Sequence, residues 1–127
     1  MTLKNIAIIF GIVFVAIGLL GFVPAANPDG KLLGVFAVNT MHNLVHVATG
    51  ILALAVGFAS DKASRIFFQV FGIVYALVAA LGFVTGDGML LGMVSNNAAD
   101  TWLHVVIAVV SLYLGFMMKP AIAAPAQ

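Results

Sequence analysis

The chain has 127 residues, of which 64% are hydrophobic and only 7% are charged, whereas a soluble domain carries about 25% charged residues. This balance indicates a membrane protein, and a formal net charge of +1 gives no reason to expect nucleic acid as a partner. The sequence contains no cysteine, which excludes disulfide bonds, thiol catalysis and thiolate metal sites.

The first predicted element is a membrane span over Ile6–Val23, where apolar residues and glycine follow one another without interruption. A span needs about 20 such residues to cross the hydrocarbon core. The region also has features of a signal peptide, because Lys4 precedes the apolar run and the small residues Ala25 and Ala26 follow it. We expect the segment to be retained, because its sequence returns later in the chain.

A turn is predicted at Asn27–Gly30, because asparagine, proline, aspartate and glycine all favour bends. The apolar segment Leu32–Val38 that follows is too short to cross the membrane. We therefore expect it to lie along the membrane surface or over the end of the bundle. The second span is predicted over Thr40–Ala59.

Residues Ser60–Arg65 are predicted to form a short polar loop, and Ile66–Val84 to form the third span. Residues 85–97 repeat the Asp-Gly turn, and Trp102–Met118 is predicted to be the fourth span. The final residues, 120–127, are rich in alanine and proline, so we expect a disordered C-terminal tail.

Two parts of the chain have closely similar sequences. The segment FGIVFVAIGLLGFV at Phe10–Val23 returns as FGIVYALVAALGFV at Phe71–Val84. The segment DGKLLG at Asp29–Gly34 likewise returns as DGMLLG at Asp87–Gly92. We infer an internal duplication, which supports the retention of the first span.

The predicted fold class is all-α, a four-helix transmembrane bundle made of two tandem two-helix repeats. Repeat one covers residues 6–59 and repeat two covers residues 66–118, within a single membrane domain over residues 1–119. Each repeat crosses the membrane twice, so the second repeat begins on the same side as the first. The two repeats are therefore predicted to have parallel orientation.

Small residues recur about two helical turns apart on every span, which places both members of each pair on one helix face. Such residues let neighbouring helices approach closely in a membrane, so we expect a tight bundle. The pairs are Gly11 and Gly18, Gly50 and Gly57, Gly72 and Ala79, and Ala108 and Gly115.

Basic residues predict the orientation, because cytoplasmic loops are enriched in lysine and arginine. In a four-span arrangement only Lys31 lies on the side of the Asp-Gly turns. The basic residues on the opposite side are Lys4, Lys62, Arg65 and Lys119. We therefore expect a multi-pass protein of the inner (cytoplasmic) membrane, with both termini in the cytoplasm.

Polar residues able to take part in chemistry gather at the starts of the second and fourth spans. Residues three, four and seven positions apart share one face of a helix. Two such stripes match each other in the duplication: Asn39, His42 and His46, and Asn97, Asp100 and His104. The asparagines are good helix N-caps, and an acidic side chain suits the first turn of a helix. Capping does not explain the histidines.

Three roles are open for the histidines. In a structural role, His46 and His104 would hydrogen-bond across the bundle, to Asp100 or Asn43, and hold the halves in register. In a metal site, His42, His46, Asp100 and His104 would supply nitrogen and oxygen ligands suited to zinc or a redox metal. In a cofactor site, His46 and His104 would hold a haem or another tetrapyrrole from facing helices.

The sequence HNLVH at His42–His46, followed by Gly50, and the sequence DTWLH at Asp100–His104 resemble a bacterial membrane-protein family, domain of unknown function 4383. The resemblance covers most of the chain, from about Ile6 to Phe116. It implies a four-helix integral membrane protein that has no assigned activity.

No segment has the nucleophile and base of an enzyme or the glycine pattern of a phosphate-binding loop, so we do not expect an enzyme. The favoured interpretation is a structural or assembly role, as an accessory subunit of a larger membrane complex. Its partners would be the lipid bilayer and either another membrane protein or a second copy of the chain. The alternative is a metal- or tetrapyrrole-binding membrane protein.

Overall fold

A computed structural model of the protein describes residues 1–119, so the expected disordered tail, 120–127, lies outside the described residues. The described part contains four long helices: α1 (Leu3–Leu20), α2 (Thr40–Ala59), α3 (Asp61–Thr85) and α4 (Ala98–Leu112), the last continued by a π-helical turn, η3 (Tyr113–Met117). All four are long and apolar enough to cross a membrane. The predicted all-α, four-helix transmembrane bundle is confirmed.

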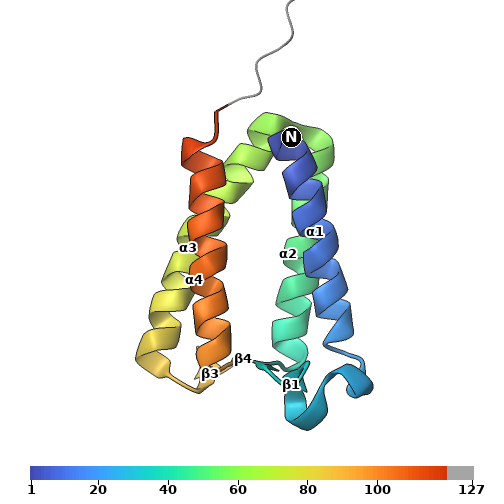
Figure 1. The fold of residues 1–127 in the computed structure, drawn as a ribbon, viewed down its shortest axis with the longest axis vertical. Coiled ribbons are helices and arrows are strands. Elements are labelled where there is room, and N and C mark those ends of the chain that lie inside the picture. Colours follow the sequence, from blue (N-terminus) through green and yellow to red (C-terminus); the bar gives the residue numbers. More distant parts are fainter. Residues whose placement is uncertain (120–127) are drawn as a thin grey trace, which may run out of the picture.

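The helices pack as two pairs, with α1 along α2 and α3 along α4. Figure 1 shows both pairs side by side, with the N-terminus and the end of η3 at the same end of the molecule. In the same view α1 and α3 run in one direction and α2 and α4 in the other. Both halves thus have the same order of elements. The duplication, the bounds of the two repeats and their parallel orientation stay predictions.

The predicted polar loop at residues 60–65 is wrong, because α3 begins at Asp61, directly after Ser60. The Ser60 hydroxyl oxygen accepts a hydrogen bond of 3.0 Å from the Ala63 N–H, which caps the new helix. The Ser64 hydroxyl donates to the carbonyl oxygens of Ser60 and Val56, at 3.0 and 3.2 Å. The sequence interpretation took the start of the apolar run, at Ile66, for the start of the third helix. Charged residues are also good helix formers, so α3 begins before that run.

Two β-hairpins cover the end of the bundle opposite the termini (Figure 1). The first joins β1 (Lys31–Leu32) to β2 (Phe36–Ala37), and the second joins β3 (Gly88–Leu90) to β4 (Val94–Asn96). Short 3-10 turns, η1 (Pro24–Ala26) and η2 (Pro28–Gly30), lead into the first hairpin. The segment expected along the surface or over the bundle end therefore lies over the end, as a hairpin that the sequence interpretation did not predict.

Both hairpins turn through the same unusual backbone conformation. Leu33 and Leu91 have φ of 53° and 52°, and the glycines that follow them, Gly34 and Gly92, have φ of 73° and 70°. Positive φ is uncommon for leucine and easy for glycine. The repeated Leu-Gly pair of the DGKLLG and DGMLLG segments therefore forms the same turn twice.

Close packing within each pair depends on glycine, as the small-residue spacing predicted. A Cβ added to Gly50 would lie 2.7 Å from the backbone nitrogen of Val15 in α1. One added to Gly72 would lie 2.9 Å from the backbone nitrogen of Leu112 in α4. Any side chain at these positions would have to push the paired helices apart.

The two pairs meet differently at the two ends of the bundle. Near the termini an aromatic cluster joins them, with Phe10 of α1 lying 5.7 Å from Phe68 and 5.1 Å from Phe71 of α3, measured between ring centroids. At the same end, within the α3–α4 pair, the carbonyl of Gly115 in η3 accepts hydrogen bonds from Gln69, at 3.0 Å, and Arg65, at 3.2 Å. Toward the hairpins the pairs leave a cavity between them.

Candidate functional site

The rim of the polar cluster caps the two helices that begin there. The Asn39 side-chain oxygen accepts a hydrogen bond of 2.9 Å from the His42 N–H at the start of α2. The Asn97 side-chain oxygen accepts one of 3.0 Å from the Asp100 N–H, and Asp100 Oδ2 accepts one of 2.9 Å from the Asn97 N–H. This reciprocal pair is a capping box. The predicted N-caps, and the place of Asp100 in the first turn, are confirmed.

The same asparagines also join the two halves of the protein. The Asn39 side-chain NH₂ donates a hydrogen bond of 2.8 Å to the Met93 carbonyl in the second hairpin. The Asn97 side-chain NH₂ donates one of 2.8 Å to the Val35 carbonyl in the first hairpin. Each helix start is thus tied to the hairpin of the other half. The sequence interpretation predicted the caps and missed this exchange.

Asp100 and His42 both hold the backbone of Ala37 in the first hairpin. Asp100 Oδ2 accepts a hydrogen bond of 3.0 Å from the Ala37 N–H. His42 Nδ1 lies 2.9 Å from the Ala37 carbonyl oxygen, so Nδ1 carries the proton and donates it. Within residues 1–119 the Asp100 carboxylate accepts from backbone N–H groups, and it makes no hydrogen bond to His104.

The other two histidines have no such partners. His46 and His104 are 9% and 5% exposed, and Nδ1 of each has no hydrogen-bond partner among the described residues. The expectation that they hydrogen-bond across the bundle to Asp100 or Asn43 is therefore wrong. The carboxylate of Asp100 is turned to the hairpin backbone, and the Asn43 side chain packs against Gly21, the residue that follows α1.

Each of these histidines lies against an aromatic ring of its paired helix. The His46 ring stacks on Phe14 with centroids 5.0 Å apart and an interplanar angle of 13°. The His104 ring meets Tyr75 edge-on, at 5.3 Å and 85°. Phe14 and Tyr75 occupy matching positions in the two similar segments of the sequence. That match, aromatic opposite histidine in both halves, was the signal available in the sequence for these two residues.

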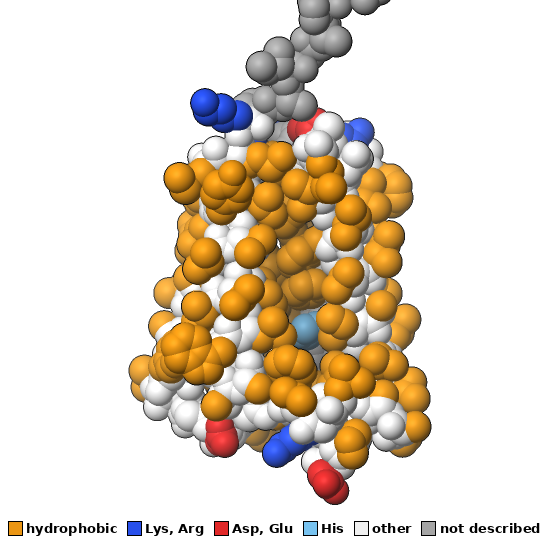
Figure 2. All heavy atoms as spheres, in the orientation of Figure 1, with side chains coloured by type: hydrophobic (Ala, Val, Ile, Leu, Met, Phe, Trp, Pro, Cys, Tyr) orange, Lys and Arg blue, Asp and Glu red, His pale blue; other side chains and the backbone are white. Residues whose placement is uncertain are grey.

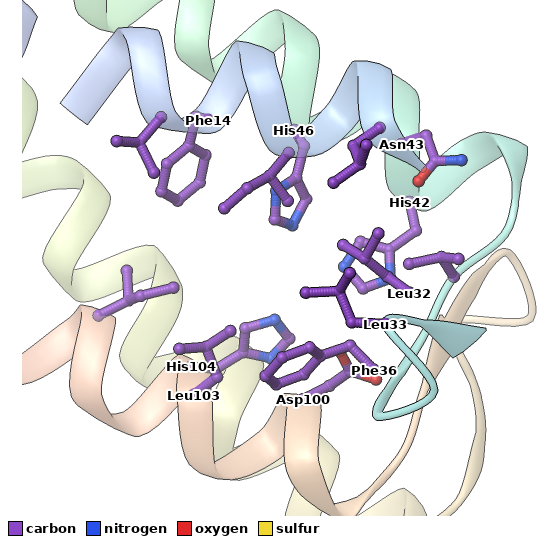
Figure 3. Close-up of a pocket in the computed structure, with 15 residues that line it drawn as sticks. Phe14, Leu32, Leu33, Phe36, His42, Asn43, His46, Asp100, Leu103 and His104 are labelled. Carbon is purple, nitrogen blue, oxygen red and sulfur yellow. The ribbon is translucent and has the colours of Figure 1, made fainter. Parts of the chain in front are cut away.

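The histidines line a cavity of about 270 Å³ between the helix pairs. Figure 3 shows His46 and His104 pointing toward each other across it, with His42 nearer the first hairpin. Figure 2 shows a histidine at the bottom of a hollow whose walls are hydrophobic. The apolar lining from the helices includes Val13, Ile17, Leu20, Leu103 and Ile107. The apolar lining from the first hairpin includes Leu32, Leu33 and Phe36.

The polar groups of the cavity are close together and carry little charge. The ring centroid of His42 lies 4.9 Å from that of His46 and 6.3 Å from that of His104. Asp100 is the one acidic residue that lines the cavity, and no lysine or arginine lines it among the described residues. The arrangement can therefore hydrogen-bond a neutral polar group inside an otherwise apolar space.

Neither of the alternatives for a bound cofactor is favoured. In the described part of the chain no group of three or more His, Asp or Glu side chains has an arrangement that could hold a metal ion, although His42, His46, Asp100 and His104 share one cavity. His46 and His104 do face each other, as a tetrapyrrole would need. A single six-membered ring already fills a cavity of about 150 Å³, so the 270 Å³ present is small for four linked pyrrole rings.

These features define a class of protein: a four-helix transmembrane bundle with a histidine-lined apolar cavity between its two helix pairs. The chain belongs to the family described as Domain of unknown function (DUF4383), whose family model matches residues 4–117. The resemblance found in the sequence is thereby confirmed. Comparison with curated proteins and comparison with solved structures gave no match.

Proposed function

We propose that the protein binds a small lipid-soluble molecule in the cavity between its helix pairs and does not act as an enzyme. The observation that carries this proposal is that the His46 and His104 rings line the cavity, point toward each other across it (Figure 3) and make no hydrogen bond within residues 1–119. Buried polar groups are almost always hydrogen-bonded, and a missing partner costs about 1–3 kcal/mol. The Nδ1 atoms of both rings are closed off from the cavity, so a polar atom of a bound ligand would hydrogen-bond to the Nε2 atoms.

The shape and composition of the cavity support a ligand that comes from the bilayer. The hollow of Figure 2 lies on a face covered with apolar side chains, which the hydrocarbon of a membrane would surround. No serine, threonine, lysine or tyrosine lines the cavity among the described residues. The nucleophile types present are histidine and Asp100, whose carboxylate is held by backbone N–H groups, so the support for binding over covalent catalysis is the lack of hydroxyl and amine nucleophiles in this lining.

A pair of variants on α4 tests this proposal. Leu103→Phe adds volume to a residue that points into the cavity (Figure 3), and Val106→Phe makes the same kind of addition at a residue that is 57% exposed. We expect purified wild-type protein and Val106→Phe to bind 2-naphthol saturably in detergent, and Leu103→Phe to bind it weakly. Calorimetric titration measures this. Equal binding by both variants, or no saturable binding by the wild type, would reject the cavity as a ligand site.

A second candidate is the structural or assembly role that the sequence favours, as an accessory subunit of a larger membrane complex. What supports it is that the rim residues Asn39, Asn97 and Asp100 are occupied by hydrogen bonds that hold the halves together. Outward aromatic side chains, such as Phe58 and Trp102 at 71% and 61% exposure, could pack on a partner protein or a second copy. Native mass spectrometry after mild extraction would detect a stoichiometric complex, and a lone monomer would count against this role.

We also propose the inner membrane as the location, with both termini in the cytoplasm. Support comes from the basic residues Lys62, Arg65 and Lys119, which line one recess at the end of the bundle that holds the termini. The opposite end carries the hairpins and Lys31. This asymmetry agrees with the tendency of cytoplasmic ends to be basic.

A further inference from the structure

We propose that the ligand of this cavity is a neutral ring with oxygen atoms on opposite edges, the chemistry of the head group of a lipid-soluble quinone or quinol. The inference rests on the proposed function, since it specifies what the proposed site would bind. It comes from four features of the cavity: the placement of its free nitrogens, their proton chemistry, its charge and its size.

The free nitrogens lie on opposite walls. His46 belongs to α2 in one helix pair and His104 to α4 in the other, and the rings point toward each other across the cavity (Figure 3). Neither ring makes a hydrogen bond among the described residues, and since Nδ1 of each is buried away from the cavity, Nε2 is the nitrogen that a ligand would meet. A molecule with a single polar atom could satisfy one wall. A ring with oxygen atoms on opposite edges could satisfy both at once.

Histidine suits both oxidation states of such a ring. A neutral imidazole has one N–H donor and one acceptor nitrogen. It can donate to the carbonyl oxygen of a quinone, and it can accept from the hydroxyl of a quinol. Lysine and arginine have donors only, so they could not accept from the quinol hydroxyl. Each histidine can therefore meet either form, with the ring proton on the nitrogen that faces the cavity for the quinone and on the other ring nitrogen for the quinol.

The charge of the cavity excludes the common anionic lipids as the preferred class. Asp100 is the acid in the lining, to which residues 1–119 contribute no lysine or arginine. The Asp100 carboxylate accepts hydrogen bonds from the backbone N–H groups of Ala37 and Asn97. A fatty-acid carboxylate or a phosphate would meet this acid without a basic partner, and an unpaired charge is costly to bury. A neutral oxygen-bearing ring avoids that cost.

The size of the cavity fits a substituted ring. A cavity of about 150 Å³ holds benzene, so the 270 Å³ between the helix pairs has room for one ring with substituents. Phe14 and Phe36 add aromatic surface to the lining. The hydrophobic walls of the hollow in Figure 2 would let an apolar tail leave toward the lipid.

Three ligands with saturated tails of similar length test the inference on the protein in lipid nanodiscs: a decyl-substituted benzoquinone, decylbenzene and lauric acid. The net contribution of one hydrogen bond, after exchange with water, is modest. Two of them should lower the dissociation constant of the quinone relative to that of decylbenzene by about tenfold or more. The reduced quinol should bind about as well as the quinone. Lauric acid should bind more weakly than either.

Variants of the two histidines test whether the preference for the quinone over decylbenzene depends on these side chains. His46→Leu and His104→Leu should lower the preference for the quinone to near that of decylbenzene, while decylbenzene itself still binds. His46→Gln and His104→Gln keep a donor and an acceptor and should retain part of the preference. Val106→Leu, on the outward face of α4 and 57% exposed, should match the wild type.

The outcomes separate this inference from the proposed function. Equal binding of quinone and decylbenzene by the wild type, or tightest binding by lauric acid, would overturn the inference and leave a ligand cavity in place. A quinone preference that survives both leucine variants would also overturn it. No saturable binding of any of the three would overturn both, and would mean that the nitrogens of the cavity are met by water alone.

Discussion

The exchange of hydrogen bonds between the two halves predicts how Asn97 contributes to stability. This side chain has two separate tasks: its oxygen caps α4 through the Asp100 N–H, at 3.0 Å, and its NH₂ donates to the Val35 carbonyl of the first hairpin, at 2.8 Å. Asn97→Ala removes both. Asn97→Ser removes only the link to Val35, because serine is as good an N-cap as asparagine.

The expected magnitudes follow from the two hydrogen bonds. Loss of an N-cap costs about 1 kcal/mol, and loss of one intramolecular hydrogen bond costs about 1 kcal/mol. Asn97→Ala should therefore lower the free energy of unfolding by about 2 kcal/mol, and Asn97→Ser by about 1 kcal/mol. Asn39→Ser should cost the same as Asn97→Ser, because Asn39 donates to Met93 in the equivalent way.

These differences are measured by unfolding the protein in mixed micelles. Circular dichroism and the fluorescence of the single tryptophan, Trp102, follow the transition. The double variant with serine at both Asn39 and Asn97 should lose about the sum of the two single effects. Lys31→Ala, at an exposed hairpin residue, is the control and should change little. If Asn97→Ser and Asn39→Ser both unfold like the wild type, the two links do not hold the halves together and the reasoning fails.

Three further predictions concern packing, the first hairpin and orientation. Gly50→Ala should lower stability by about 1–3 kcal/mol, because its Cβ would lie 2.7 Å from the Val15 backbone nitrogen; a melting temperature equal to that of the wild type would contradict this. His42→Ala should cost about 1–3 kcal/mol, since it leaves the Ala37 carbonyl without its donor, and an unchanged thermal transition would argue against that role. A reporter fused after Lys119 should read as cytoplasmic, and an external signal would refute the proposed topology.

Local features of the sequence were enough to predict the four helices and the N-caps of two of them, α2 and α4. Apolar runs of membrane-spanning length predict spans whatever the rest of the chain does, because lipid requires every backbone group to be satisfied within the helix. The second span was predicted as Thr40–Ala59, where α2 lies. Asn39 and Asn97 were recognised as caps, because a cap bonds to a backbone N–H within its own first turn.

Helix ends and hairpins were predicted less well. The boundary at Ser60 was missed because hydrophobicity reports where lipid ends, and α3 begins in the polar residues before that point. The hairpins were missed because each strand has only two or three residues, too few for an alternating pattern to appear in the sequence. The Asp-Gly pairs predicted a bend before each hairpin, whereas the turn at each Leu-Gly pair and the strand pairing were not predicted.

The partners of the polar side chains were decided by the tertiary structure alone. The sequence placed Asp100 and His104 on one stripe of a helix, which suggested that they act together. In the folded chain Asp100 reaches the backbone of Ala37, far away in the sequence, and leaves His104 without a partner. Helical periodicity fixes which face a side chain occupies. What lies opposite that face depends on how the two helix pairs and their hairpins pack against each other. Here that packing leaves a cavity lined by two histidine rings that make no hydrogen bond within residues 1–119.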